Sequence, residues 1–109
     1  MKDDIQYAVK FVQDTLSYAD ALGQVAEEAT ELAQAALKLE RVVRGTNPTP
    51  VGRVEATVKV MEETADVLNA LEVAGFLVDS ENIAAMREVK MARWEERLRK
   101  KAAEVQHGS

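Results

Sequence analysis

The chain has 109 residues, of which 47% are apolar and 30% are charged, and its formal net charge is −5 at neutral pH. A chain of this length can bury one hydrophobic core but not two, and its acidic balance argues against general binding to polymeric nucleic acid. It contains no cysteine, which excludes disulfides, thiolate zinc sites and cysteine nucleophiles and suits a reducing cytosol.

Helix is predicted almost throughout, because Ala, Leu, Glu, Lys, Arg and Gln dominate and apolar residues recur at spacings of three and four. The first predicted helix covers about residues 4–18, with Asp3 or Asp4 as its N-cap. Its apolar stripe consists of Ile5, Val9, Val12 and Leu16.

The second predicted helix, about residues 20–44, carries the strongest periodic signal of the chain. Its apolar stripe consists of Leu22, Val25, Ala29, Leu32, Ala36, Leu39 and Val43. Gly45 follows directly and is expected to cap the helix, and Pro48 and Pro50 cannot continue it. We therefore expect a loop from Gly45 to Arg53.

The third predicted helix runs from about residue 54 to residue 78. Its inner face consists of Val60, Val67, Leu71, Ala74 and Val78. Ser80 offers an N-cap for a fourth helix. The apolar side chains that the fourth helix could bury are Ile83, Met91, Trp94 and Leu98.

Together these segments predict an all-α fold, a four-helix bundle in a single domain spanning residues 1–109, with a frayed tail at about residues 104–109. No apolar run approaches the roughly 20 residues that span a bilayer, and the N-terminus lacks the apolar segment of a secretion signal. We therefore expect a cytoplasmic protein without a membrane partner.

Two acidic patterns resemble one another, and each lies on a predicted helix. Glu28 and Glu31 lie one turn apart on the second helix, as do Glu63 and Asp66 on the third. If the two helices pack antiparallel, the four carboxylates can converge at the rim of one groove. At about 6 Å and an effective dielectric of about 20, each pair would repel by roughly 3 kcal/mol. Geometry alone leaves open a divalent-ion site and an ordinary solvated acidic face.

The ligand chemistry narrows the choice of metal. Oxygen-only ligands favour Mg²⁺ or Mn²⁺ over zinc or copper. A di-iron centre in a bundle core would need an ExxH motif on each of two helices, whereas the only histidine, His107, lies in the tail.

Positive charge is concentrated near the C-terminus. Residues 81–109 carry 7 basic and 5 acidic side chains, whereas residues 1–80 carry 7 and 14. A basic stripe at helical spacing consists of Lys90, Arg93, Arg97 and Lys100. Such a stripe near a metal-loaded acidic groove suits a polyphosphate substrate. The alternative is a solvated helix face paired with neighbouring glutamates, which we favour for Lys100.

Three segments together resemble the MazG-like branch of the all-α nucleoside triphosphate pyrophosphohydrolases, whose hallmark is EExxE followed by ExxD. The three segments are Glu27-Glu28-Ala29-Thr30-Glu31, Glu62-Glu63-Thr64-Ala65-Asp66 and Lys90-Met91-Ala92-Arg93-Trp94. The resemblance covers about residues 20–98. It implies an enzyme of the nucleotide pool that hydrolyses nucleoside triphosphates between the α- and β-phosphates to a monophosphate and pyrophosphate.

The resemblance also implies roles for individual residues. The four carboxylates that match ExxE and ExxD would hold Mg²⁺ and serve catalysis; they are Glu28, Glu31, Glu63 and Asp66. The residues expected to bind the substrate are Lys90, Arg93, Asn69 and Arg97. Which carboxylate acts as the general base stays open. Members of the family form dimers or tetramers, so a homo-oligomer is expected.

Two alternatives remain at this point. The first is an enzyme like the phosphoribosyl-ATP pyrophosphohydrolase of histidine synthesis, which shares the acidic motifs but fits the segment from Lys90 to Trp94 less well. The second is a non-catalytic helical module, whose acidic residues form a solvated face and whose function is dimerisation or another interaction.

Overall fold

The computed structural model describes residues 2–45, 52–77 and 79–107, and this part of the chain contains four α-helices and no β-strand. The helices are α1 (Lys2–Thr15), α2 (Tyr18–Arg44), α3 (Arg53–Val73) and α4 (Glu81–His107). The all-α class is therefore confirmed. The chain divides into two compact units, Met1–Phe76 and Leu77–Ser109, which are described separately. None of the four helices has the length and apolar character that a membrane crossing requires.

The boundary between α1 and α2 lies at Ser17, because its side chain caps the second helix. The hydroxyl of Ser17 accepts a hydrogen bond of 3.0 Å from the backbone N–H of Asp20. The predicted first helix, which ended at about residue 18, is therefore too long, and Tyr18 belongs to α2. Asp3 and Asp4 lie inside the first turn of α1, so their prediction as N-caps is wrong.

Glycines set the ends of both long helices of the first unit. Gly45 has the left-handed φ of 67° and donates a backbone hydrogen bond of 2.9 Å to Arg41, which confirms the predicted cap of α2. Gly75 has φ of 90°, and the N–H of Phe76 next to it donates to the carbonyl of Leu71 over 2.8 Å. Because this reversal closes α3 at Val73, the predicted end at about residue 78 is wrong. Val78 lies outside the described residues.

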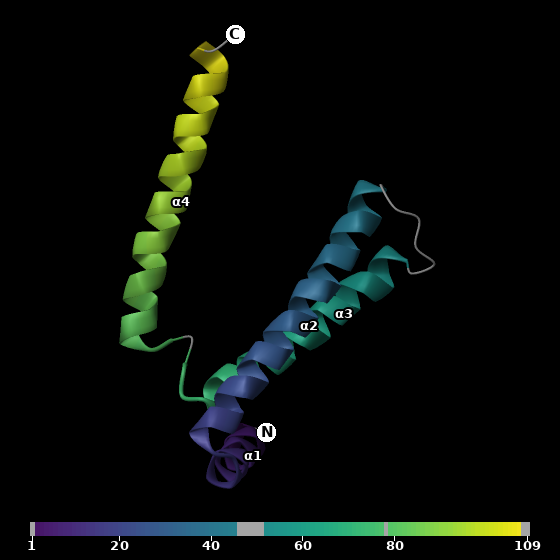
Figure 1. Ribbon diagram of the computed structural model, residues 1–109, viewed down its shortest axis with the longest axis vertical. Coiled ribbons are helices and arrows are strands. Elements are labelled where there is room, and N and C mark those ends of the chain that lie inside the picture. Colours follow the sequence, from purple (N-terminus) through teal and green to yellow (C-terminus); the bar gives the residue numbers. More distant parts are fainter. Residues whose placement is uncertain (1, 46–51, 78, 108–109) are drawn as a thin grey trace. The chain divides into compact units, whose positions relative to one another are not determined.

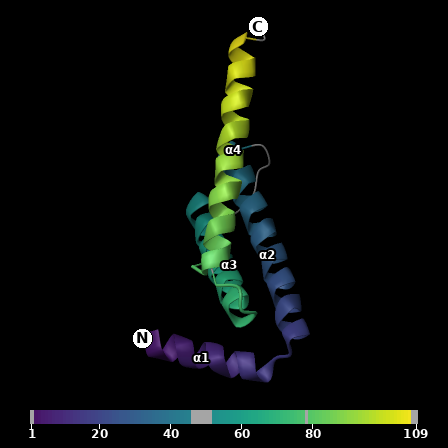
Figure 2. The same cartoon turned by 90° about the vertical axis from the view of Figure 1, so that its left-hand side faces the viewer.

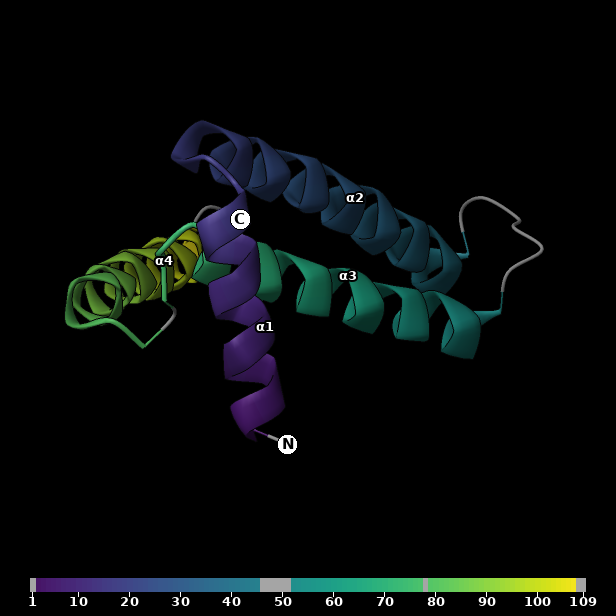
Figure 3. The ribbon, with the colours of Figure 1, turned by 90° about the horizontal axis from the view of Figure 1, so that it is seen from below.

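Helices α2 and α3 form an antiparallel hairpin and lie side by side along most of their lengths (Figures 1 and 3). On both helices the buried and half-buried residues recur at alternating spacings of four and three, as in a coiled coil. On α2 these positions are Ala21, Val25, Glu28, Leu32, Ala35, Leu39 and Val42. On α3 they are Ala56, Val60, Glu63, Val67 and Ala70, and Ala74 at the C-cap continues the pattern.

In this contact, which we call the seam, the most buried apolar residues are small. Every apolar side chain that is buried in the described residues is an alanine, and small side chains allow two helices to approach closely. The predicted stripe of α2 is correct at Val25, Leu32 and Leu39. It is wrong at four positions, which are exposed: Leu22, Ala29, Ala36 and Val43. The true stripe includes Glu28, and a search for apolar residues cannot find a seam that contains a carboxylate.

Helix α1 crosses the end of the hairpin and packs against α3 (Figure 2). Two glutamine side chains of α1 reach the C-terminal part of α3. Gln6 donates to the side chain of Glu72 over 3.3 Å, and Gln13 donates to the backbone carbonyl of the same residue over 3.2 Å. These contacts place α1 beside the last turns of α3.

The second unit contains α4. As predicted, Ser80 caps this helix, because its hydroxyl accepts from the backbone N–H of Ile83 over 3.3 Å. Most of the apolar side chains that the fourth helix was expected to bury are exposed, since α4 is the only helix of this unit. The exposed fractions of Met91, Trp94 and Leu98 are 56%, 53% and 57%.

Candidate metal centre

Three of the four predicted carboxylate ligands meet at the seam. Glu28 and Glu31 come from successive turns of α2, and Glu63 comes from the facing part of α3. Each of the three offers a carboxylate oxygen, and these oxygens lie within 4.8 Å of one another. We call these three residues the acidic cluster. The antiparallel packing of the two acidic motifs, on which the prediction depended, is therefore confirmed for three residues.

The fourth predicted ligand, Asp66, is not part of the acidic cluster. Its side chain is exposed, and with Asn69 and Glu28 it lines a small hollow between α1, α2 and α3. Gln24 of α2 and several apolar side chains also line this hollow, among them Val12 of α1 and Val73 of α3. The structure thus places Asp66 on the α1 side of Glu28, next to the cluster rather than within it.

The three side chains of the acidic cluster differ in their exposure to solvent. Glu63 is only 5% exposed, Glu28 is half-buried and Glu31 is exposed. The Oε2 atoms of Glu28 and Glu63 are buried and accept no hydrogen bond within the described part of the chain. Such unpaired buried oxygens are costly, because they have lost water without gaining a partner. A cation placed among them would remove this cost, so the carboxylates fit a hard divalent ion.

One hydrogen bond orients the cluster on the α2 side. The side-chain amide of Gln24 donates to Oε1 of Glu28 over 2.7 Å. This bond holds Oε1 and leaves the buried Oε2 of the same carboxylate free to face a ligand. Gln24 thus has the position of a residue that supports a metal ligand without touching the metal.

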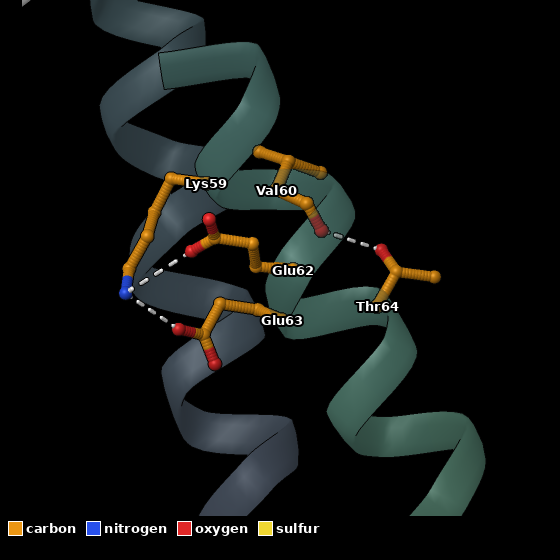
Figure 4. A network of polar contacts seen from close by, with 5 residues as sticks. All are labelled: Lys59, Val60, Glu62, Glu63 and Thr64. Carbon is orange, nitrogen blue, oxygen red and sulfur yellow. Dashed lines mark hydrogen bonds and ion pairs between the residues drawn. The ribbon is translucent and has the colours of Figure 1, made fainter. Parts of the chain in front are cut away.

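A lysine that sequence reasoning missed neutralises part of the cluster (Figure 4). Lys59 lies one turn before Glu63 on α3, and its Nζ is 2.9 Å from Oε1 of Glu63 and 3.9 Å from Oε2 of Glu62. The pKa of Lys59 is raised by its hydrogen bond to Glu63 and by the charge of that carboxylate. The spacing of four residues between Lys59 and Glu63 was the available signal, because such pairs meet on one helix face.

The acidic cluster also changes the protonation of Glu31. The negative charge of Glu28 is the largest cause that raises the pKa of Glu31 above its ordinary 4.5, and partial desolvation and the charge of Glu63 act in the same direction. The crowding of negative charge therefore favours a proton, or another cation, at this position.

This raised pKa predicts how the stability of the metal-free chain depends on pH. Between pH 4.5 and the raised pKa of Glu31, the folded chain holds a proton that the unfolded chain has lost. The free energy of unfolding should therefore fall as pH rises through this window. Urea unfolding in EDTA between about pH 4 and pH 7 measures the slope, which Glu31→Gln should make less negative. An identical slope in the variant would show that Glu31 does not carry this effect.

The predicted phosphate-binding residues lie in the second unit. Lys90, Arg93 and Arg97 are exposed and line one hollow along α4, together with Met91 and Trp94. The predicted basic stripe is thus confirmed as one face of this helix, and its role in substrate binding stays a prediction. The side chain of His107 lies outside the described residues.

The chain matches no protein-family model, no curated protein and no solved structure in comparisons with all three. The MazG-like resemblance therefore rests on the sequence motifs quoted above and stays a prediction.

Proposed function

We propose that this protein is a Mg²⁺-dependent nucleotide pyrophosphohydrolase of the MazG-like type, which cleaves nucleoside triphosphates between the α- and β-phosphates. The observation that carries the proposal is the acidic cluster. Two helices bring an oxygen of each of three carboxylates within 4.8 Å of one another, and two of these carboxylates have a buried oxygen that finds no partner among the described residues. Unpaired carboxylate oxygens in the seam lower the stability of the hairpin, so their presence there favours a binding function over a structural one.

In this proposal Glu28, Glu31 and Glu63 hold the metal, and Asp66 completes the set on the strength of the ExxD motif. The same set could hold Mn²⁺. When bound, the ion supplies charge neutralisation at the triphosphate and a more acidic water. The carboxylates of the chain would bind and orient the ion. The hairpin keeps these carboxylates at fixed separations, because the alanines of the seam leave little freedom between the helices.

Other residues of the chain would position the substrate. Lys90, Arg93 and Arg97 neutralise phosphate oxygens, as charged donors on one helix face can do. Asn69 lines the hollow next to Glu28 and Asp66, where an amide can contact a sugar hydroxyl or a water. These four roles follow from the resemblance and from the faces on which the side chains lie.

The proposal includes a homo-oligomer, a dimer or tetramer of single-domain MazG-like bundles in the cytoplasm. It is supported by the small size of the buried apolar side chains, since among the described residues every buried apolar side chain is an alanine. Large apolar residues remain exposed on α1 and on α4, for example Phe11 at 68% and Leu98 at 57%. Other copies of the chain would cover these surfaces.

Release of pyrophosphate tests the activity. We expect the full chain with Mg²⁺ to release pyrophosphate from at least one of a set of canonical and damaged nucleoside triphosphates, and EDTA to stop the reaction. Phosphoribosyl-ATP belongs in the same set, because its selective cleavage would indicate the histidine-pathway alternative. Glu28→Gln keeps the shape of the side chain but removes a charge, and it should lower kcat/KM at least about 100-fold.

The matched control is Glu27→Gln, which changes the same charge on an exposed neighbouring position. It should leave kcat/KM within about twofold, because surface charges act weakly at a distance. Full turnover in Glu28→Gln would refute the assigned site. An absence of pyrophosphate release from every substrate would instead favour the second candidate, a non-catalytic interaction module, for which the exposed apolar face of α4 is the supporting observation.

A further inference from the structure

Lys59 is the cation of the metal-free cluster. In the described part of the chain it is the only basic residue that forms an ion pair with Glu28, Glu31 or Glu63. Its ammonium lies 2.9 Å from Oε1 of Glu63, so it pairs with a carboxylate that belongs to the proposed metal centre. One ammonium cannot neutralise three carboxylates, and no group in the described part of the chain pairs with the Oε2 atoms of Glu28 and Glu63.

The two partners of this ion pair differ in their freedom to move. The side chain of Glu63 is 7% exposed and is fixed in the seam, whereas the side chain of Lys59 is 59% exposed. Lys59 also contacts the exposed Glu62 at 3.9 Å. Its long stem can therefore turn its ammonium into water or toward Glu62 by rotation of side-chain bonds, without a change in either helix (Figure 4). The carboxylate would remain in place.

We propose that Lys59 is a displaceable counter-ion, which pairs with Glu63 when no metal is bound and is expelled from it by the incoming divalent ion. Residue 59 thereby sets the affinity of the site for the ion. This inference rests on the metal centre proposed above. Its physical basis is direct competition: the ammonium and the ion are attracted to the same carboxylate, and they repel one another at these distances. In the metal-free chain this ion pair stabilises the fold, because the buried carboxylate of Glu63 keeps Lys59 as its partner.

The test uses the full chain with Mn²⁺ as the probe and two matched variants. Lys59→Gln removes the charge and keeps a polar side chain of similar reach. Lys38→Gln removes an equal charge from a lysine on α2 that lines the same cavity as Lys59, Glu31 and Glu63. Within the described residues Lys38 forms no ion pair with the cluster. The second variant therefore measures the general effect of one positive charge nearby.

Binding by calorimetry and thermal unfolding are measured for each variant, the latter in EDTA and in saturating Mn²⁺. We expect Lys59→Gln to bind Mn²⁺ about tenfold more tightly than wild type, and Lys38→Gln to change the affinity less than about threefold. In EDTA, Lys59→Gln should melt several degrees below wild type, because Glu63 loses its partner. In saturating Mn²⁺ this difference should disappear or reverse.

The outcomes separate this inference from the proposed function. If wild type and Lys59→Gln bind Mn²⁺ equally, and the variant melts lower by the same amount with and without Mn²⁺, Lys59 has a structural role alone and the inference is overturned while the metal centre stands. If neither protein binds Mn²⁺, both proposals fail. Binding by Lys59→Gln alone would support the inference in its strongest form.

Discussion

Replacing Glu63 with alanine is expected to stabilise the metal-free chain by about 1–2 kcal/mol and to abolish the binding of divalent cations. Glu63 is 5% exposed, and its Oε2 accepts no hydrogen bond among the described residues. Seven residues to either side, the same seam position holds the buried Ala56 and Ala70, so alanine is compatible with this line of contact. Alanine is also the better helix former. Lys59 would be released into water, where its charge costs little.

Urea unfolding in EDTA, and again with Mn²⁺, measures both halves of this prediction. Wild type should gain stability from Mn²⁺, whereas Glu63→Ala should not. Glu62→Ala is the matched control, because it removes a carboxylate from an exposed neighbouring position. That control should change the free energy of unfolding by less than about 0.5 kcal/mol and should keep the response to Mn²⁺. A loss of more than about 2 kcal/mol in Glu63→Ala without metal would show that the carboxylate stabilises the fold.

The second large effect concerns assembly, and we expect the apparent stability of the protein to depend strongly on its concentration. The described residues fully bury only alanines among their apolar side chains, and larger apolar side chains remain exposed, so we expect association to add to the stability of the chain. If folding requires association, a tenfold rise in protein concentration stabilises a dimer by about 1.4 kcal/mol per mole of dimer. Thermal or urea unfolding across a hundredfold range of concentration therefore measures the coupling directly.

Leu98→Glu is the variant that tests whether α4 takes part in assembly. Met91, Trp94 and Leu98 share one apolar face of this helix, and a charge at its centre should shift the mass measured by light scattering to a smaller species. Ala103→Glu adds the same charge on a different, exposed face of α4 and should leave the mass unchanged. A monomeric wild type, with an unfolding midpoint independent of concentration, would contradict the proposed oligomer.

Much of the fold follows from local sequence signals that need no knowledge of packing. The four helices were predictable from composition and spacing, and the caps at Gly45 and Ser80 from residue type alone. The errors lie where two local signals compete. Ser17 is a residue type that often caps a helix, and it caps α2. The apolar spacing of the first helix continues past the point where α1 ends, so the predicted boundary fell too late. Gly75 closes α3 because glycine adopts a positive φ, although the residues after it are also apolar.

The candidate site was predictable in part for a similar reason. Spacing within one helix fixes which carboxylates share a face, and the expected antiparallel packing of the two helices brings Glu63 to Glu28 and Glu31. The relative register of α2 and α3 is set by the alanine seam, and this register leaves Asp66 beside the hollow with Asn69. The pairing of Lys59 with Glu63 depends on which way a long side chain turns, and residue type alone does not fix that choice.

The most direct test of the central claim is a calorimetric titration of the metal-free wild-type chain with Mg²⁺ and with Mn²⁺. If carboxylates from α2 and α3 form a divalent-cation site, the titration shows saturable binding of at least one ion per chain, and Glu28→Gln and Glu63→Ala each abolish it. No saturable binding of either ion, by wild type and by Lys59→Gln alike, would contradict the account.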